Sequence, residues 1–236
     1  IFFLLKRIKP DILHLISLKP IIFGGLISFV SPVKYLILSV TGLGSMFIDN
    51  NYFSKIRKTI FNFLYKLIFL FPNLKVILQN NDDLNYLVKN SKLKKKDVEI
   101  IRGSGINLNL FRYSKIPKGT FTILMASRII RDKGIFEYIE AIKYLKKIKF
   151  NAKFMLIGDI DTENPSAIPN SLIKKWERKK LIKYLTHQID IKKYIKKSSL
   201  VVLPSYREGF PKILMEAAAC GRAVITTNAP GCRDAV

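Results

Sequence analysis

Short apolar runs alternate with longer amphipathic segments along this chain. The runs at 34–40, 75–80 and 200–204 are rich in Leu, Ile and Val, which is typical of buried strands. In the segment 135–145, Ile, Tyr and Leu recur every three or four residues, as they do on the buried face of a helix. Because strands and helices alternate in this way, the pattern predicts an α/β fold built on parallel sheets.

The length of the chain allows two such domains. A chain of 236 residues is long enough for two modest α/β domains. The segment 107–119, which contains Pro117 and Gly119, has the composition of a linker. We therefore predict one domain over 1–108 and a second over 109–236.

Two glutamates near the end of the chain flank a predicted helix start. Glu208 and Glu216 are separated by seven residues. Pro211 suits the first helical position, where its missing N–H costs nothing, and Gly221 suits the end of the helix. The run at 200–204 delivers Glu208 to the carboxyl edge of a sheet, which is where open α/β sheets bind ligands.

The start of this helix has the features of an anion site. The backbone N–H groups of Gly209, Phe210 and Lys212 are expected to be unpaired donors at the positive end of the helix dipole. Lys212 and Glu216 are four residues apart and therefore share one helix face. A phosphate at the helix end, a sugar near Glu208 and a ribose near Glu216 would fit this arrangement.

A second candidate cluster follows an apolar run that begins at Phe121. Arg128 and Lys133 come after this predicted strand and before the amphipathic segment 135–145. Both would emerge at the strand's carboxyl end, where a guanidinium and an ammonium group are a common pair for binding a diphosphate. The alternative is that both are cations of a solvated loop.

These motifs resemble those of a known enzyme family. The string from Glu208 to Glu216 is similar to the Glu-x7-Glu motif of retaining glycosyltransferases of the GT-B fold, in family 4. The string Pro-Gly-Cys-Arg-Asp at 230–234 is similar to a Pro-Gly-Cys-Arg-acidic string in the bacterial subgroup that extends polyprenyl-diphosphate-linked sugars. The resemblance implies two Rossmann-like domains that face each other across a cleft. The first would be an acceptor-side domain, incomplete at its start, and the second a nucleotide-sugar-binding domain, incomplete at its end.

The resemblance also implies roles for particular residues. Arg128 and Lys133 would hold the diphosphate and stabilise it as it leaves, while Glu208 would hold hydroxyls of the donor sugar. Glu216 would hold the ribose. The other implied donor-binding residues are Gly209, Phe210, Pro211 and Lys212. Such a site retains the anomeric configuration and works by electrostatic stabilisation, so we expect no side-chain nucleophile, no cofactor and no obligatory metal.

Other polar residues are interpreted as structural. Asp159 and Asp161 form an Asp-x-Asp string, but the Pro-containing loop that follows favours a turn over a metal site. His187 is interpreted as part of a surface loop and His14 as a strand residue. Ile16 stands where many members of the family have a second His, so the first domain's contacts with the donor sugar stay open.

The formal net charge of the chain is +24, which calls for an explanation. A general abundance of Lys would explain the charge without any partner. An anionic membrane surface is a second explanation, because it attracts Lys and Arg. Nucleic acid is a third, but the sequence has no helix-turn-helix, zinc-finger spacing or RNP-like string, so we expect no nucleic-acid partner.

The segment 51–71 bears on the membrane explanation. It combines Phe, Ile and Leu with Lys and Arg and has few acidic neighbours, as an interfacial helix does. Charged residues interrupt every apolar run before the ~18 residues of a membrane span are reached. The alternative is a basic-backed helix packed on the sheet of the first domain.

Together these features predict a retaining glycosyltransferase. It would move a hexose or N-acetylhexosamine from a nucleotide sugar, UDP-linked, to a lipid-diphosphate-linked saccharide in surface polysaccharide or glycan assembly. It would act as a peripheral protein at the cytoplasmic face of the cell membrane, in contact with anionic lipid. The alternatives are a GT-B enzyme with a soluble acceptor and a catalytically inactive, membrane-associated scaffold of the same fold.

Overall fold

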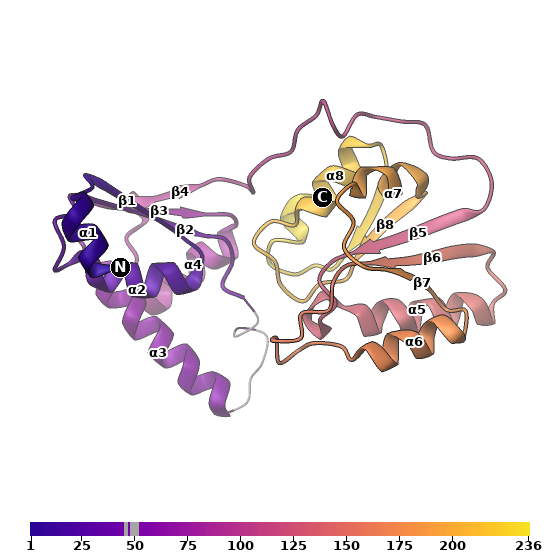
Figure 1. Cartoon of the computed structure of the whole chain (residues 1–236), viewed down its shortest axis with the longest axis horizontal. Helices are drawn as coiled ribbons and strands as arrows, with labels where there is room; N and C mark the ends of the chain where they lie inside the picture. Colours follow the sequence, from indigo (N-terminus) through magenta and orange to yellow (C-terminus); the bar gives the residue numbers. More distant parts are fainter. Residues whose placement is uncertain (45–46, 48–51) are drawn as a thin grey trace. The chain divides into compact units, whose positions relative to one another are not determined.

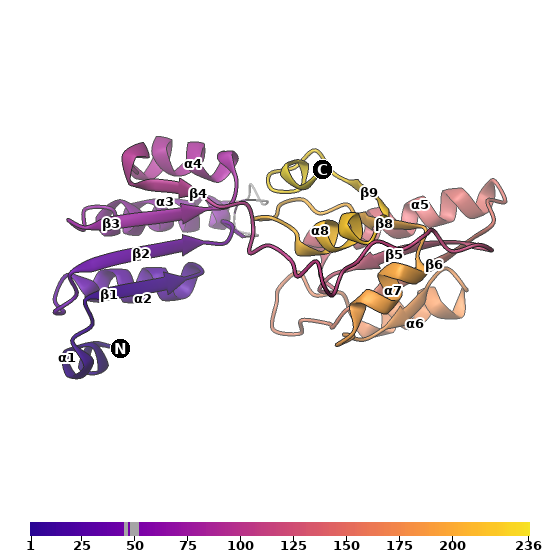
Figure 2. The same cartoon turned by 90° about the horizontal axis from the view of Figure 1, so that it is seen from above.

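The computed structural model describes residues 1–44, 47 and 52–236. By their contacts these residues form two compact units (Figures 1 and 2). The first comprises Ile1–Ser104 and Glu208–Phe210, and the second comprises Gly105–Arg207 and Pro211–Val236. Each unit is described in turn below.

The first unit is built on a four-stranded sheet in which every neighbouring pair is parallel. In spatial order its strands are β1 (Ile12–Ile16), β2 (Tyr35–Val40), β3 (Leu74–Leu78) and β4 (Val98–Ile100). The helices are α1 (Phe2–Ile8), α2 (Leu18–Ser28), α3 (Tyr52–Ile68) and α4 (Asn81–Ser91). The predicted alternation of strands and helices is therefore confirmed for this half of the chain.

The core of the first unit lies between its sheet and its helices. Alternate residues of β2, such as Leu36 and Leu38, are fully buried, because successive side chains of a strand point to opposite faces. Phe61, Tyr65 and Ile68 of α3 belong to the same buried cluster. Helix α3, which falls within the segment 51–71 predicted as a helix, thus packs one of its faces into the core, while Asn51 lies outside the described residues.

The second unit is built on a five-stranded parallel sheet. In spatial order its strands are β7 (Lys183–Leu185), β6 (Ala152–Ile157), β5 (Phe121–Ala126), β8 (Leu200–Leu203) and β9 (Ala223–Thr226). The helices are α5 (Ile135–Lys147), α6 (Asn170–Arg178), α7 (Ile191–Lys197) and α8 (Lys212–Ala219).

Helices cover both faces of this second sheet (Figure 1). Ile123 and Phe154 pack with α5 and α6 on one face, whereas Leu124 packs with α7 and α8 on the other. Ile139 and Ile142 are among the buried residues of α5, so the helical spacing read from the sequence is confirmed. Because helices cover both faces, ligands reach this sheet at the ends of its strands.

Helix α8 differs by one residue from the prediction. Lys212 is its first residue, and Pro211 is the N-cap with φ −75° and ψ 111°. The prediction that Pro211 is the first helical residue is therefore wrong by one position, because its ψ is extended rather than helical. The helix ends at Ala219 with Cys220 as its C-cap, and Gly221 takes the left-handed position just beyond it with φ 73°, so Gly221 ends the helix as predicted.

Candidate active site

The carboxyl edge of the second sheet brings two loops together. β5 and β8 are adjacent and parallel, so the chain leaves both strands at the same edge. The loop after β5 continues into a short 3₁₀ helix, η3 (Arg131–Lys133). The backbone N–H of Tyr206 and the hydroxyl of Ser205 both donate to the carbonyl oxygen of Asp132, at 3.0 and 3.2 Å. These bonds join the loop that carries Lys133 to the loop that leads to Glu208.

Two glycines allow the loops at this edge to lie close together. Gly134 has φ 77°, and a Cβ atom there would lie 2.0 Å from the carbonyl oxygen of Pro204. Gly158 has φ 150°, and a Cβ atom there would lie 1.8 Å from the carbonyl oxygen of Ser127. Only glycine fits both positions, because these backbone angles are strained for other residues and the space is already filled.

A cavity of about 590 Å³ lies at this edge. It is lined by residues that follow β5 and β6, by residues from the segment 187–191 and by α8. Its ionisable lining residues are Arg128, Asp159, His187, Lys212 and Glu216. The volume falls in the range of small-molecule sites.

Three of the eight candidate catalytic and donor-binding residues predicted from the sequence line this cavity. Arg128, Lys212 and Glu216 line it, although Arg128 and Glu216 are 88 positions apart by their numbers. The other five candidates are not among its lining residues: Lys133, Glu208, Gly209, Phe210 and Pro211. The roles of all eight remain predictions.

Glu216 is the buried acid of the cavity. Only 7% of the residue is exposed, and this burial raises the pKa of its carboxyl group above the usual value. Lys212 Nζ lies 3.7 Å from Glu216 Oε1 and opposes the rise in pKa. The two residues share one helix face, as predicted. A buried carboxyl group in a cavity wall is a strong acceptor for a ligand hydroxyl, because little water competes for it.

Arg128 has an acidic partner that sequence analysis missed. Its Nη1 lies 3.0 Å from Asp161 Oδ2, and the Arg128 side chain is 60% exposed. We interpreted Asp159 and Asp161 only as a turn, and both do lie outside the helices and strands. The sequence had no local signal for the ion pair, because the partners are 33 positions apart.

His187 lies on an exposed loop, as predicted, and it also lines the cavity. Its backbone N–H donates to Asp159 Oδ1 at 2.8 Å. Asp159 therefore holds the segment after β7 against the end of β6, and this contact shapes one wall. His14, by contrast, lies on β1 as predicted, with Nε2 2.8 Å from Ser39 Oγ.

Comparison with known families identifies the chain. The family model described as "Glycosyl transferases group 1" matches residues 108–236, which include the whole of the cavity lining. The chain belongs to this family. The structure resembles that of Anabaena HepE in complex with UDP, with a TM-score of 0.76 and 20% sequence identity over 99% of this chain and 64% of that one. The predicted GT-B class of α/β fold is thereby confirmed.

Two curated relatives extend the comparison to the whole chain. The N,N'-diacetylbacillosaminyl-diphospho-undecaprenol alpha-1,3-N-acetylgalactosaminyltransferase of Campylobacter jejuni is 30% identical over 98% of this chain and 62% of its own length. The UDP-Gal:alpha-D-GlcNAc-diphosphoundecaprenol alpha-1,3-galactosyltransferase of Escherichia coli is 24% identical over 97% of this chain and 60% of its own length. The chain thus spans about three fifths of the length of these relatives.

Proposed function

We propose that the protein is a retaining glycosyltransferase that moves a hexose or N-acetylhexosamine from a UDP-sugar to a lipid-diphosphate-linked saccharide. The observation that carries the proposal is the cavity that unites Arg128, Lys212 and Glu216 at the carboxyl edge of the second sheet. The relatives from Campylobacter jejuni and Escherichia coli support it, since their names give diphospho-undecaprenol-linked sugars as acceptors.

In this proposal the cavity binds the nucleotide part of the donor. Glu216 accepts hydrogen bonds from the ribose hydroxyls, and the guanidinium group of Arg128 binds the diphosphate. Arg128 can do so because its ion pair with Asp161 is largely solvated and therefore weak, roughly 0.2–1 kcal/mol. A diphosphate carries more charge than one carboxylate and would displace it.

The remaining predicted residues complete the proposed site. Lys133 adds a second cation to the diphosphate, and Glu208 holds the donor sugar. The site stabilises the negative charge that develops on the leaving diphosphate, and loss of one such group typically costs ~10²–10³ in rate. We propose that no cofactor and no obligatory metal takes part, so transfer should survive an excess of EDTA.

The surface of α3 supports a peripheral contact with a membrane. Phe61 and Tyr65 are buried on one face, while the opposite side exposes large apolar residues beside cations such as Lys55 and Arg57. The exposed apolar residues are Tyr52, Phe53, Ile56, Ile60 and Phe63. Both interpretations of 51–71 are thus compatible, because the helix packs on the core and still presents an interfacial surface.

The helices in the described part of the chain are all too short or too polar to cross a bilayer. We propose that the protein docks on the cytoplasmic face of the membrane through α3, whose exposed apolar side chains lie beside Lys55 and Arg57, two cations that would meet anionic lipid. Vesicle flotation with and without anionic lipid, using wild type and Phe53→Ser/Phe63→Ser, tests this contact. If the variant floats with anionic vesicles to the same extent as wild type, α3 is excluded as the docking surface.

The donor-transfer proposal is tested by a screen of UDP-sugars with a lipid-diphosphate-linked acceptor, read by mass spectrometry. We expect a mass increase of one hexose or N-acetylhexosamine with wild type and a loss of at least about 100-fold in rate with Arg128→Ala. A soluble acceptor that is used equally well would favour the alternative enzyme. Absence of UDP binding in calorimetry would favour the inactive scaffold.

A further inference from the structure

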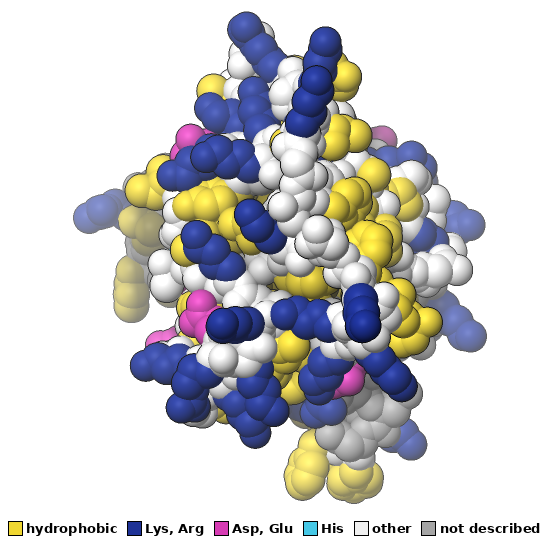
Figure 3. All heavy atoms as spheres, turned by 90° about the vertical axis from the view of Figure 1, so that its right-hand side faces the viewer, with side chains coloured by type: hydrophobic (Ala, Val, Ile, Leu, Met, Phe, Trp, Pro, Cys, Tyr) yellow, Lys and Arg dark blue, Asp and Glu magenta, His cyan; other side chains and the backbone are white. Residues whose placement is uncertain are grey.

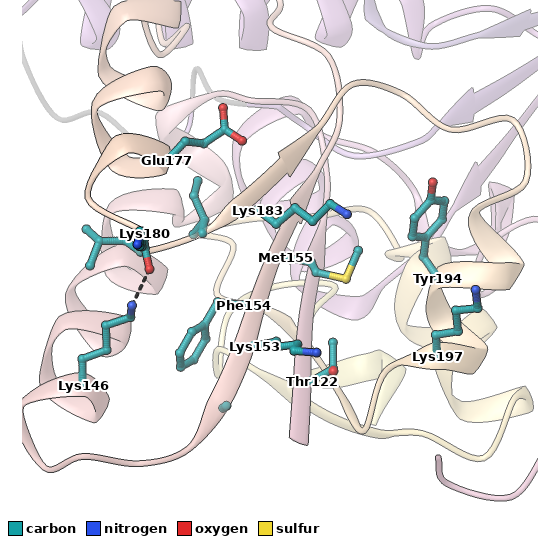
Figure 4. A pocket seen from close by; sticks show the side chains of 13 residues that line it. Thr122, Lys146, Lys153, Phe154, Met155, Glu177, Lys180, Lys183, Tyr194 and Lys197 are labelled. Atoms are coloured by element: carbon teal, nitrogen blue, oxygen red, sulfur yellow. Dashed lines mark hydrogen bonds between the residues drawn. The ribbon is translucent and has the colours of Figure 1, made fainter. Parts of the chain in front are cut away.

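A second cavity lies at the opposite edge of the second sheet. Its volume is about 630 Å³, and it is lined by the first residues of β5, β6 and β7 and by the end of α7. Figure 4 shows this cavity from close by. The cavity of the proposed donor site adjoins the carboxyl ends of β5 and β6, and the two cavities share no lining residue.

Three lysines face one another across this cavity. Met155 of β6 is paired with Lys183 of β7, and Lys153 lies two residues before Met155. The side chains of Lys153, Met155 and Lys183 therefore point to the same face of the sheet. Figure 4 shows Lys153 and Lys183 extending towards α7, which contributes Tyr194 and Lys197. Lys153 and Lys183 from the sheet and Lys197 from α7 thus line the cavity together with Met155 and Tyr194.

No acidic side chain neutralises these three ammonium groups within the described part of the chain. The side chains of Lys153, Lys183 and Lys197 make no ion pair and no hydrogen bond there. Glu177 is the one carboxylate among the lining residues, and its Oε1 already accepts the backbone N–H of Tyr184 at 3.0 Å. Lys146, a further lining lysine, donates to a backbone carbonyl.

The concave arrangement distinguishes this cluster from the other lysines of a very basic chain. The view onto this end of the second unit shows many Lys and Arg side chains and few acids (Figure 3). Separate surface lysines are screened by water and salt, whereas cations in a hollow with apolar walls focus their field on one point. Their mutual repulsion is relieved when an anion of matching charge enters.

We propose that this cavity is a binding site for a phosphate-bearing anion, separate from the donor site. Lysine ammonium groups bind phosphate oxygens as flexible point charges, and three of them match the charge of a diphosphate. The ring of Tyr194 and the thioether of Met155 offer contacts to an organic group attached to the phosphate. The phosphate can belong to a soluble compound or to a lipid headgroup, and the chemistry of recognition is the same for both.

The test compares two triple variants with equal loss of charge. The cavity variant is Lys153→Gln/Lys183→Gln/Lys197→Gln. The control variant is Lys147→Gln/Lys175→Gln/Lys179→Gln, which removes three exposed lysines of the same unit that do not line the cavity. Pyrophosphate is titrated by calorimetry into each whole protein in the presence of saturating UDP, so that the donor site is occupied.

We expect pyrophosphate to bind wild type and the control variant, and to bind the cavity variant at least about tenfold more weakly, since one charge-assisted hydrogen bond is worth roughly that factor. Pyrophosphate should also raise the unfolding temperature of wild type and the control more than that of the cavity variant. Equal binding by the two triple variants would overturn the proposal.

Vesicles distinguish the two sources of phosphate. If pyrophosphate does not bind, but phosphatidylglycerol vesicles bind wild type and the control more tightly than they bind the cavity variant, the site takes a lipid headgroup. If wild type binds neither probe, or if both triple variants lose vesicle binding equally, the cavity is not a phosphate site and its lysines serve only as general surface charge.

Discussion

Replacing Glu216 by Gln should make the protein more stable and at the same time a weaker binder of UDP. The change keeps the size and shape of the side chain but removes its charge. Glu216 is buried, and burial raises the pKa of its carboxyl group, so the ionised form is disfavoured by the fold. The neighbouring ammonium group of Lys212 is exposed and is readily solvated once the carboxylate is gone.

The size of the effect on binding follows from the proposed contact with the ribose. A hydrogen bond to a charged group contributes about 1.5–3 kcal/mol. Each 1.4 kcal/mol is about a factor of ten in the dissociation constant, so Glu216→Gln should weaken UDP binding by roughly 10- to 100-fold. Because the carboxyl group is buried, its hydrogen bond to the ribose is shielded from water and contributes more binding free energy than a hydrogen bond on the surface would.

The pH dependence gives the sign of the stability effect. With the pKa of Glu216 raised in the folded state, the carboxyl group is protonated in both folded and unfolded protein at low pH, and wild type carries no penalty there. As pH rises through the raised pKa, the folded state must ionise a buried group and wild type loses stability. The advantage of Glu216→Gln should therefore be small in acid and largest at neutral pH.

The assay combines urea unfolding across pH with UDP calorimetry on the same preparations. Glu140→Gln is the matched control for charge removal, because Glu140 is an exposed glutamate of α5 that also pairs with a lysine one turn away, Lys143, and does not line the cavity. Two results would contradict the reasoning: a variant that is less stable than wild type at neutral pH, or one that binds UDP as tightly as wild type does.

Two further changes test other parts of the second unit. Arg222→Met should destabilise it by about 2–4 kcal/mol in urea unfolding. The buried guanidinium group donates from Nη2 to the carbonyl oxygens of Ser114 and Lys115 at 2.9 and 3.0 Å, and these acceptors would lose their partner. Unchanged stability would show that this network is dispensable. Asp161→Asn should tighten UDP binding up to about fivefold in calorimetry. The change frees Arg128 from its ion pair and removes a negative charge beside the proposed diphosphate site. Weaker binding would show instead that Asp161 positions the guanidinium group.

Local sequence patterns were sufficient to predict several of the helices and strands. The spacing of apolar residues in α5 marks the face that is buried, and the apolar run at β8 is a strand. Helix α4 begins directly after Asn80, whose side chain accepts the backbone N–H of Asp83 at 2.8 Å and so caps the helix. Such signals are local, because they depend on residues within one or two turns of each other.

Contacts between distant segments could not be read in this way. The pairing of Arg128 with Asp161, and the position of His187 in the cavity wall, depend on which strand ends lie next to each other. The lysines of the second cavity come from β6, β7 and α7, and no spacing in the sequence relates them. Strand order 7-6-5-8-9 decides all of these neighbours.

The sequence by itself determined the fold class, the family motifs and the candidate residues of the proposed donor site, because periodicity and short motifs are properties of contiguous residues. Only the tertiary structure decided which charges meet, since parallel strands are joined through helices and their adjacency depends on the packing of the whole unit. It also decided which apolar residues of α3 are buried and which stay exposed, because the helix carries apolar side chains on both sides and only its packing selects the face that enters the core.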